Sequence, residues 1–161
     1  MNNTKFWETL KSRGITFCSG VPDSTFSNIY QTMFEDPDIR YVPAIREDVA
    51  IGIASAAYFN DEIGAVIIQN SGIGNLINPL TSFNLMYKIP ALIIVGWRGY
   101  SHDAPEHEIM GKKTLEFFDL LEMPYKVPNE ENLSEVLDEL LMQMKKYSLP
   151  GALIVRSGVI T

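Results

Sequence analysis

Residues 65–75 read AVIIQNSGIGN, and this stretch decides the fold. Its first half, Ala65–Gln69, is almost uniformly apolar, which is typical of a strand covered by helices on both faces of a sheet. Its second half is a polar turn with two glycines, and a helical pattern follows at about residues 73–86. A buried strand, a turn and a helix make up one unit of a parallel α/β layered domain.

The same alternation extends from this unit in both directions along the chain. The other expected strands are Ile15–Cys18, Tyr41–Ala44, Ala91–Val95, Ala152–Val155 and a shorter one at Tyr125–Val127. Helices are expected at about residues 4–13, 24–34, 47–59, 73–86, 107–121 and 131–147, with Ser24, Ser71 or Gly72, and Asn132 near their starts. We therefore expect an α/β fold, a three-layer α/β/α arrangement with a mostly parallel sheet, in a single domain over residues 1–161.

Composition restricts the class of protein. Of the 161 residues 46% are hydrophobic, enough for one substantial core. The formal net charge of -7 argues against nucleic acid or an anionic membrane as a partner. A single cysteine, Cys18, rules out an intrachain disulfide and a multi-cysteine metal site. The amino terminus lacks a signal pattern and no apolar stretch is long enough to span a bilayer, so we expect a cytoplasmic location.

Loops at the carboxyl ends of the strands are where ligands bind in this fold class, and they hold several acids. Asp23 follows the first strand in a tight turn, where it is a helix cap, an active-site acid or both. Glu47 and Asp48 follow the second strand and begin an apolar helix, where helix-start stabilisation explains them without catalysis. Position alone does not separate these alternatives.

The turn at residues 69–75 is a candidate anion cradle, because free backbone N–H groups at a helix start attract anions. Its glycines do not have the spacing of a Walker loop or of a dinucleotide fingerprint. They serve close helix packing equally well, which leaves Gln69, Asn70 and Asn75 to bond either backbone or ligand.

Residues 96–108 form the longest irregular segment and contain both histidines. The residues Arg98, His102, His107, Lys112 and Lys113 predict a local basic cluster suited to a small dianionic ligand. The alternative is a solvated loop. Metal binding is not expected, because the histidines lack a helical ligand spacing, and a serine hydrolase is excluded because Gly-x-Ser-x-Gly is absent.

Several ordered motifs resemble one family, the sulfopyruvate and phosphonopyruvate decarboxylases, which depend on thiamine diphosphate. They are GVPDS at 20–24, REDVA at 46–50, QNSGIGN at 69–75 continuing through NPLTS at 78–82, IP at 89–90, WRG at 97–99 and EHEIMGK at 106–112. The resemblance extends from about residue 5 to the end. It implies the pyrimidine-binding domain in an alpha subunit, because the Gly-Asp-Gly motif of the family's second domain is absent.

The resemblance also implies partners, cofactors and residue roles. A beta subunit would supply the contacts to diphosphate and Mg²⁺ in a hetero-oligomer, and a small anionic 2-oxo acid would lose CO2 and yield the acetaldehyde. Glu47 matches the acid that hydrogen-bonds the aminopyrimidine ring nitrogen. The implied site residues are Glu47, Asp23 and His107 for catalysis, Glu47, Gln69, Asn70, Ser71 and Gly72 for the cofactor, and Asn75, Arg98 and His107 for the substrate, with no metal ligand in this chain.

This sequence departs from the family pattern at Glu106, where a glutamine is usual, and at Ala104, where a glutamate is frequent. An extra acid at Glu106 would repel a sulfonate or phosphonate unless it were compensated. Another 2-oxo-acid decarboxylase, a carboligase and a noncatalytic anion-binding module remain alternative functions. Helices 47–59 and 73–86 are candidates for a subunit interface, although core packing explains their small and apolar residues equally well.

Overall fold

The computed structural model describes residues 1–160, so Thr161, the last residue of the expected domain, lies outside it. These residues contain a six-stranded sheet in the order β2-β1-β3-β4-β6-β5, and every strand pair is parallel. The strands are β1 (Phe17–Gly20), β2 (Arg40–Pro43), β3 (Ala65–Gln69), β4 (Leu92–Trp97), β5 (Tyr125–Lys126) and β6 (Gly151–Arg156). The α/β fold with a parallel sheet is confirmed.

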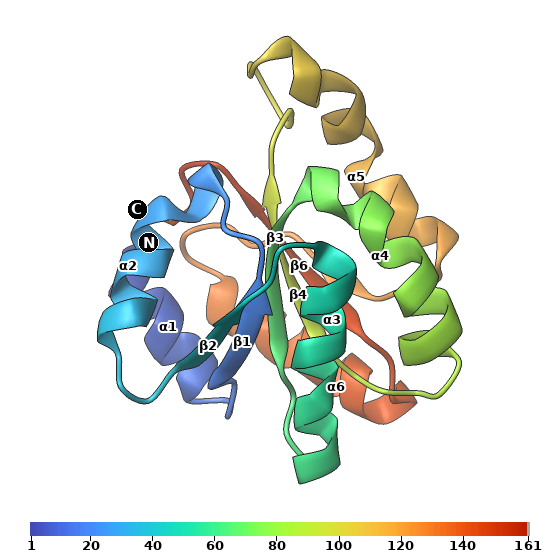
Figure 1. Cartoon of the computed structure of the whole chain (residues 1–161). Coiled ribbons are helices and arrows are strands. Elements are labelled where there is room, and N and C mark those ends of the chain that lie inside the picture. Colours follow the sequence, from blue (N-terminus) through green and yellow to red (C-terminus); the bar gives the residue numbers. More distant parts are fainter. Residues whose placement is uncertain (161) are drawn as a thin grey trace.

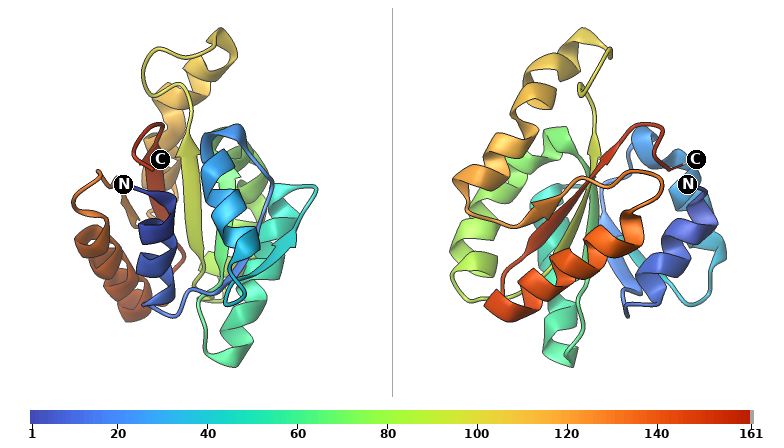
Figure 2. Two further views of the ribbon diagram at one scale, coloured as in Figure 1. Left: turned by 90° about the vertical axis from the view of Figure 1, so that its left-hand side faces the viewer. Right: turned by 180° about the vertical axis from the view of Figure 1, so that it is seen from behind.

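Helices cover both faces of the sheet (Figures 1 and 2). They are α1 (Asn3–Lys11), α2 (Ser27–Glu35), α3 (Glu47–Ser55), α4 (Ile73–Pro79), α5 (Glu108–Leu120) and α6 (Leu133–Tyr147). Alternate residues of β3 enter two separate cores, Ile67 with α1, α2 and α6, and Ile68 with α3, α4 and α5. This division explains the uniformly apolar strand, because both of its faces are buried.

Several expected boundaries differ from the structure: the helix expected at 47–59, for example, is α3 followed by a 3-10 segment, Ala56–Asn60. Two of the differences have a clear physical reason. β1 begins two residues later than expected, because the turn that caps the end of α1 extends to Ile15: its N–H donates to Leu10 O at 3.1 Å, and Gly14 takes a φ of 77°. The helix expected at 73–86 is α4 followed by a π-helical segment, Leu80–Leu85. That change begins directly after Pro79, which lacks the N–H needed to continue regular α-helical bonding.

Candidate active site

The carboxyl edge of the sheet brings together loops that are far apart in the sequence (Figure 1). β1 lies between β2 and β3, so the chain first moves to one neighbour of β1 and later returns on the other side. A reversal of this kind opens a crevice beyond the strand ends, which is where ligands bind in α/β sheets. The acids and amides identified in the sequence follow the ends of β1, β2 and β3.

Glu47 begins α3 directly after β2, and its carboxylate turns toward the start of α4. Asn75 Nδ2 donates a hydrogen bond to Glu47 Oε2 at 2.7 Å. Gly72 makes the approach possible, because a Cβ built on it would lie 2.6 Å from Glu47 Oε1. The side chain is only half-buried. The loops after β2 and β3 therefore hold a carboxylate in place and leave it accessible to a ligand.

The neighbouring acid, Asp48, has a different environment. Arg46 donates to both carboxylate oxygens of Asp48, and Asp48 Oδ1 also accepts from the Val49 N–H. The hydrogen bond from Arg46 lowers the pKa of Asp48. Helix-start stabilisation accounts for Asp48, whereas the contacts of Glu47 run across β1 to another loop.

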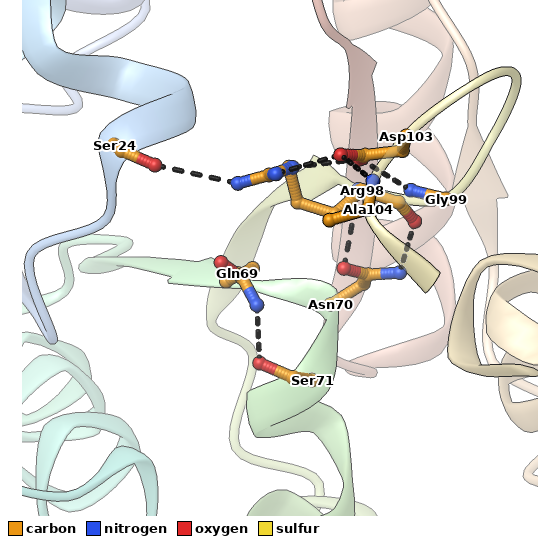
Figure 3. Close-up of polar contacts among 8 residues, drawn as sticks. All are labelled: Ser24, Gln69, Asn70, Ser71, Arg98, Gly99, Asp103 and Ala104. Carbon is orange, nitrogen blue, oxygen red and sulfur yellow. Dashed lines mark hydrogen bonds and ion pairs between the residues drawn. The ribbon is translucent and has the colours of Figure 1, made fainter. Parts of the chain in front are cut away.

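The turn after β3 separates into an outer and an inner part (Figure 3). On the outside, Gln69 Nε2 donates to Ser71 Oγ at 2.6 Å. On the inside, Asn70 is fully buried and its Nδ2 donates to Arg98 O at 2.8 Å and to Thr114 Oγ1 at 2.9 Å. Asn70 Oδ1 accepts from the Arg98 N–H at 3.2 Å. Asn70 thus positions the loop after β4, and a direct cofactor contact by its side chain stays a prediction.

Asp23 occupies the cap position before a 3-10 turn at Ser24–Phe26, but its side chain makes no capping hydrogen bond. The expectation of a side-chain cap by Asp23 is therefore wrong. Its Oδ2 atom is buried and has no partner among the described residues. Gly96 permits this placement, since a Cβ there would lie 2.9 Å from Asp23 Oδ2. A buried acceptor without a partner calls for an explanation, and contact with a ligand is one.

Arg98 does not stand free in a basic cluster. Its Nε and Nη2 atoms donate to the two carboxylate oxygens of Asp103, each at 2.7 Å (Figure 3). Asp103 also accepts from the Gly99 and Ala104 N–H groups, and these bonds, led by that from Arg98, hold its pKa far below the usual range.

The two lysines of the expected basic cluster are paired as well. Lys112 bonds Glu108 at 2.6 Å and Lys113 bonds Glu116 at 2.7 Å. The cluster expected from the sequence is therefore largely neutralised by acids that lie within one helical turn or one short loop of each cation. Residues 96–113 therefore do not offer unpaired lysine and arginine side chains to a dianionic ligand.

Comparisons with known proteins identify the family. Residues 4–123 match the family described as thiamine pyrophosphate enzyme, N-terminal TPP binding domain. The chain belongs to this family. Within the family, the sulfopyruvate decarboxylase subunit alpha of Methanocaldococcus jannaschii is 34% identical over 150 residues, which cover 92% of this chain and 89% of that protein. The resemblance seen in the sequence is confirmed.

Longer members of the thiamine pyrophosphate enzyme family match over part of their length. The phosphonopyruvate decarboxylase of Streptomyces viridochromogenes is 32% identical over 155 residues, which cover 94% of this chain and 39% of that protein. The chain thus spans well under half of this relative. The solved structure of benzoylformate decarboxylase from Polynucleobacter necessarius matches 97% of the chain and 30% of its own, with a TM-score of 0.69 at 19% identity, and it supports the fold alone.

The residues around Glu47 fit the aminopyrimidine half of thiamine diphosphate, the cofactor of this family. The observation that decides the fit is the cradle of Glu47, in which Gly72 has no Cβ and Asn75 fixes one carboxylate oxygen. An accessible carboxyl group can hydrogen-bond a heteroaromatic ring nitrogen and share a proton with it. Glu47 and the outer pair Gln69 and Ser71 are the residues that would hold the ring.

His107 is the last residue of a 3-10 turn, Pro105–His107, that leads into α5 beyond the edge of the sheet (Figure 1). The turn packs tightly on the loop after β4, because a Cβ on Gly99 would lie 2.0 Å from His107 O. The imidazole is half-buried. No contact joins it to Glu47, so its catalytic and substrate roles stay predictions.

Three residues of the site were not singled out in the sequence. Asp103 orients Arg98, Thr114 receives a hydrogen bond from Asn70, and Ser157 lines the same cavity as Arg98. Ser157 follows β6, so the rule that ligands gather after strand ends would have found it. Asp103 lies within the polar loop at 96–108, but the sequence did not reveal its pairing with Arg98.

Residues 1–160 contain neither a membrane-spanning helix nor a cluster of metal-binding side chains. Every helix in this range is too short or too polar to cross a bilayer. The same range holds no group of three or more histidine, cysteine, aspartate or glutamate side chains placed to bind a metal ion.

Proposed function

We propose that this chain is the pyrimidine-binding alpha subunit of a thiamine-diphosphate-dependent decarboxylase of 3-sulfopyruvate or 3-phosphonopyruvate. The reaction consumes the 2-oxo acid and one proton and yields CO2 and the corresponding acetaldehyde. Support comes from the family membership and from the names of the relatives, which include alpha subunits of nearly the same length. The single observation that carries the proposal is the Glu47 carboxylate held by Asn75 at the crevice.

A beta subunit completes the proposed enzyme. It would carry the diphosphate-binding domain and the Mg²⁺ ion, and the cofactor would lie between the two chains in a hetero-oligomer. The names of the alpha-subunit relatives support a divided enzyme. The proposal also includes a cytoplasmic location and a single pyrimidine-binding domain over residues 1–161.

The residues of this chain have separate roles in the proposed reaction. When bound, thiamine diphosphate supplies the nucleophilic carbon and the electron sink for the departing CO2. Glu47 shares a proton with the ring nitrogen of the aminopyrimidine, which is the step that prepares the cofactor. Asp23, with its buried unpartnered oxygen, and His107 handle the proton that replaces CO2 at the former 2-oxo carbon. Asn75 acts through Glu47, because its amide fixes the carboxylate.

The test uses the chain co-expressed and purified with its diphosphate-binding partner. CO2 release from both acids is compared for the wild type, Glu47→Gln and the matched control Asp48→Asn. Because general acid–base catalysis contributes about 100- to 10,000-fold, we expect Glu47→Gln to lose at least about 100-fold in kcat. The Asp48→Asn complex should remain within about threefold of the wild type, since the contacts of Asp48 stay within the start of α3.

Gel filtration of each complex shows whether assembly is intact, which separates loss of chemistry from loss of structure. An assembled Glu47→Gln complex with normal activity would overturn the role of Glu47. An assembled wild-type complex that releases no CO2 from either acid would overturn the proposed function.

A further inference from the structure

A polar cavity of about 390 Å³ opens among the loops that follow β1, β4 and β6. The residues that line it include Ser24, Thr25, Ser101 and Ser157, together with Arg98 and His102. The hydroxyl of Thr25 is buried and has no hydrogen-bond partner among the described residues. A cavity lined in this way offers hydrogen-bond donors to a compact group with several acceptor oxygens.

Arg98 is held in one orientation at this cavity (Figure 3). Asp103 accepts from Nε and Nη2, so the remaining edge of the guanidinium, Nη1, is turned to the cavity wall, 3.4 Å from Ser24 Oγ. From below, Asn70 fixes the backbone of Arg98 through its N–H and its carbonyl. Because the guanidinium is ordered before a ligand arrives, little side-chain entropy is lost on binding.

Acids outnumber cations around the cavity. Asp103 neutralises Arg98, and Asp23, next in sequence to Ser24, adds a second negative charge that acts on Arg98. A second arginine, Arg156, stands behind the wall, where its Nη1 bonds the hydroxyl of Tyr100 at 3.1 Å. Glu106 also acts on Arg98 from the 3-10 turn that precedes α5. The cavity therefore offers oriented donors without a net positive charge.

We propose that this cavity binds the charged tail of the substrate and selects a monoanionic sulfonate over a dianionic phosphonate. The inference rests on the proposed function and names the substrate class of that site. A sulfonate carries one charge and three acceptor oxygens, which Arg98 Nη1 and the surrounding hydroxyls can satisfy. A phosphonate has a second ionisation near neutral pH, as phosphate monoesters do, and its second charge would meet the carboxylates of Asp23, Asp103 and Glu106.

The experiment measures kcat/KM of the assembled complex for 3-sulfopyruvate and 3-phosphonopyruvate at pH 8 and pH 6. We expect a preference for the sulfonate of about 10-fold or more at pH 8, corresponding to one unfavourable charge contact. The preference for the sulfonate should narrow at pH 6, where the phosphonate takes up a proton and loses its second charge. Equal or better use of the phosphonate at pH 8 would overturn the selectivity.

Arg98→Gln tests whether the tail lies at this cavity. Loss of a charged hydrogen-bond donor should lower kcat/KM for 3-sulfopyruvate by about 10- to 100-fold, expressed mainly in KM. The matched control is Arg13→Gln, because Arg13 forms the same two-bond pair with Asp138, at 2.9 and 2.8 Å, but lies after α1 at the opposite edge of the sheet. This control should behave as the wild type.

Binding without reaction separates the inference from the proposed function. Ethanesulfonate and ethylphosphonate lack the reacting carbonyl, and ligand-observed NMR measures their binding to the same complexes. Ethanesulfonate should bind the wild type and Arg13→Gln, and about 10-fold more weakly to Arg98→Gln. Unchanged binding to Arg98→Gln would overturn the site even in an active enzyme. Selective binding by an inactive complex would retain the site while the decarboxylase proposal failed.

Discussion

Any side chain at position 72 would occupy the space that the Glu47 carboxylate fills. Gly72 therefore has a role in the site that does not depend on backbone flexibility. An added methyl group on Gly72 would lie 2.5 Å from Glu47 Cγ and 2.6 Å from Oε1. The flexible side chain of Glu47 can move away, so the fold should tolerate the added methyl group. The site should not tolerate it, because the displaced carboxylate loses its hydrogen bond from Asn75.

For Gly72→Ala we therefore expect a folded, assembled complex whose kcat falls by about 100-fold, the scale of a misplacement of roughly 1 Å in an active site. Thermal melting and gel filtration should remain close to the wild type while CO2 release is lost. The control is Gly74→Ala, two residues further on, where no atom lies within 4 Å of the added Cβ. A fully active Gly72→Ala complex would contradict the cradle.

The lowered pKa of Asp103 predicts a dependence of stability on pH. Its pKa is lowered, first by the hydrogen bond from Arg98 and then by the Gly99 and Ala104 N–H groups. A carboxyl group with a depressed folded-state pKa adds stability above its unfolded pKa of about 3.9 and loses it as the pH falls through the folded value.

The melting temperature of Asp103→Asn should accordingly lie below that of the wild type at pH 7, and the difference should shrink as the pH falls well below 4. Between pH 5 and 8 the difference should be flat, because Asp103 does not titrate there. A difference that changed across neutral pH would show that another group controls this loop.

At the scale of elements, α5 and the loop after β4 are locked by two glycines in contact. A Cβ on Gly111 would lie 2.1 Å from Gly99 O, and Gly99 itself has a φ of 69°. Both atoms in conflict belong to the backbone or are directly attached to it, so no side chain can rotate away. The helix would have to move.

Gly111→Ala should therefore lower the free energy of unfolding by about 1–3 kcal/mol, as overpacking does. The same helix provides a control in Lys113→Ala, where an exposed ion pair with Glu116 is lost and the change should stay within about 0.5 kcal/mol. Urea unfolding of the two variants and the wild type measures both changes in the free energy of unfolding. Equal stabilities would mean that α5 is not anchored at Gly111.

The elements also show where sequence reasoning succeeds and where it stops. The apolar run at Ala65–Gln69 predicted a strand buried on both faces, because a continuous apolar run fits a strand that helices cover on both sides. The strand-end rule likewise predicted the neighbourhood of Glu47. Side-chain pairing is different. The inward turn of Asn70 and the pairing of Arg98 with Asp103 depend on directions set by tertiary packing, so the sequence did not show that the expected basic cluster is largely neutralised.

At the scale of the whole molecule, exposed glycine and apolar residues lie on α3 and close to its start. Gly52 is exposed within the helix and no atom lies within 4 Å of a Cβ built on it. Ile45, just before the helix, is 91% exposed and Val49 is 46% exposed. Glycine in a helix interior costs about 0.5–1 kcal/mol relative to alanine, so its presence here favours close approach by another chain.

Gly52→Ala tests this surface, because the change has opposite effects on the chain and on the assembly. Alone, the variant should be about 0.5–1 kcal/mol more stable than the wild type, since helix propensity improves and nothing is displaced. If α3 packs against the beta subunit, the added methyl group should raise the dissociation constant measured by analytical ultracentrifugation, and activity should fall at low protein concentration and recover at high concentration. Unchanged assembly together with the gain in stability would place the partner on another face of the sheet and leave Ile45 and Val49 simply exposed to solvent.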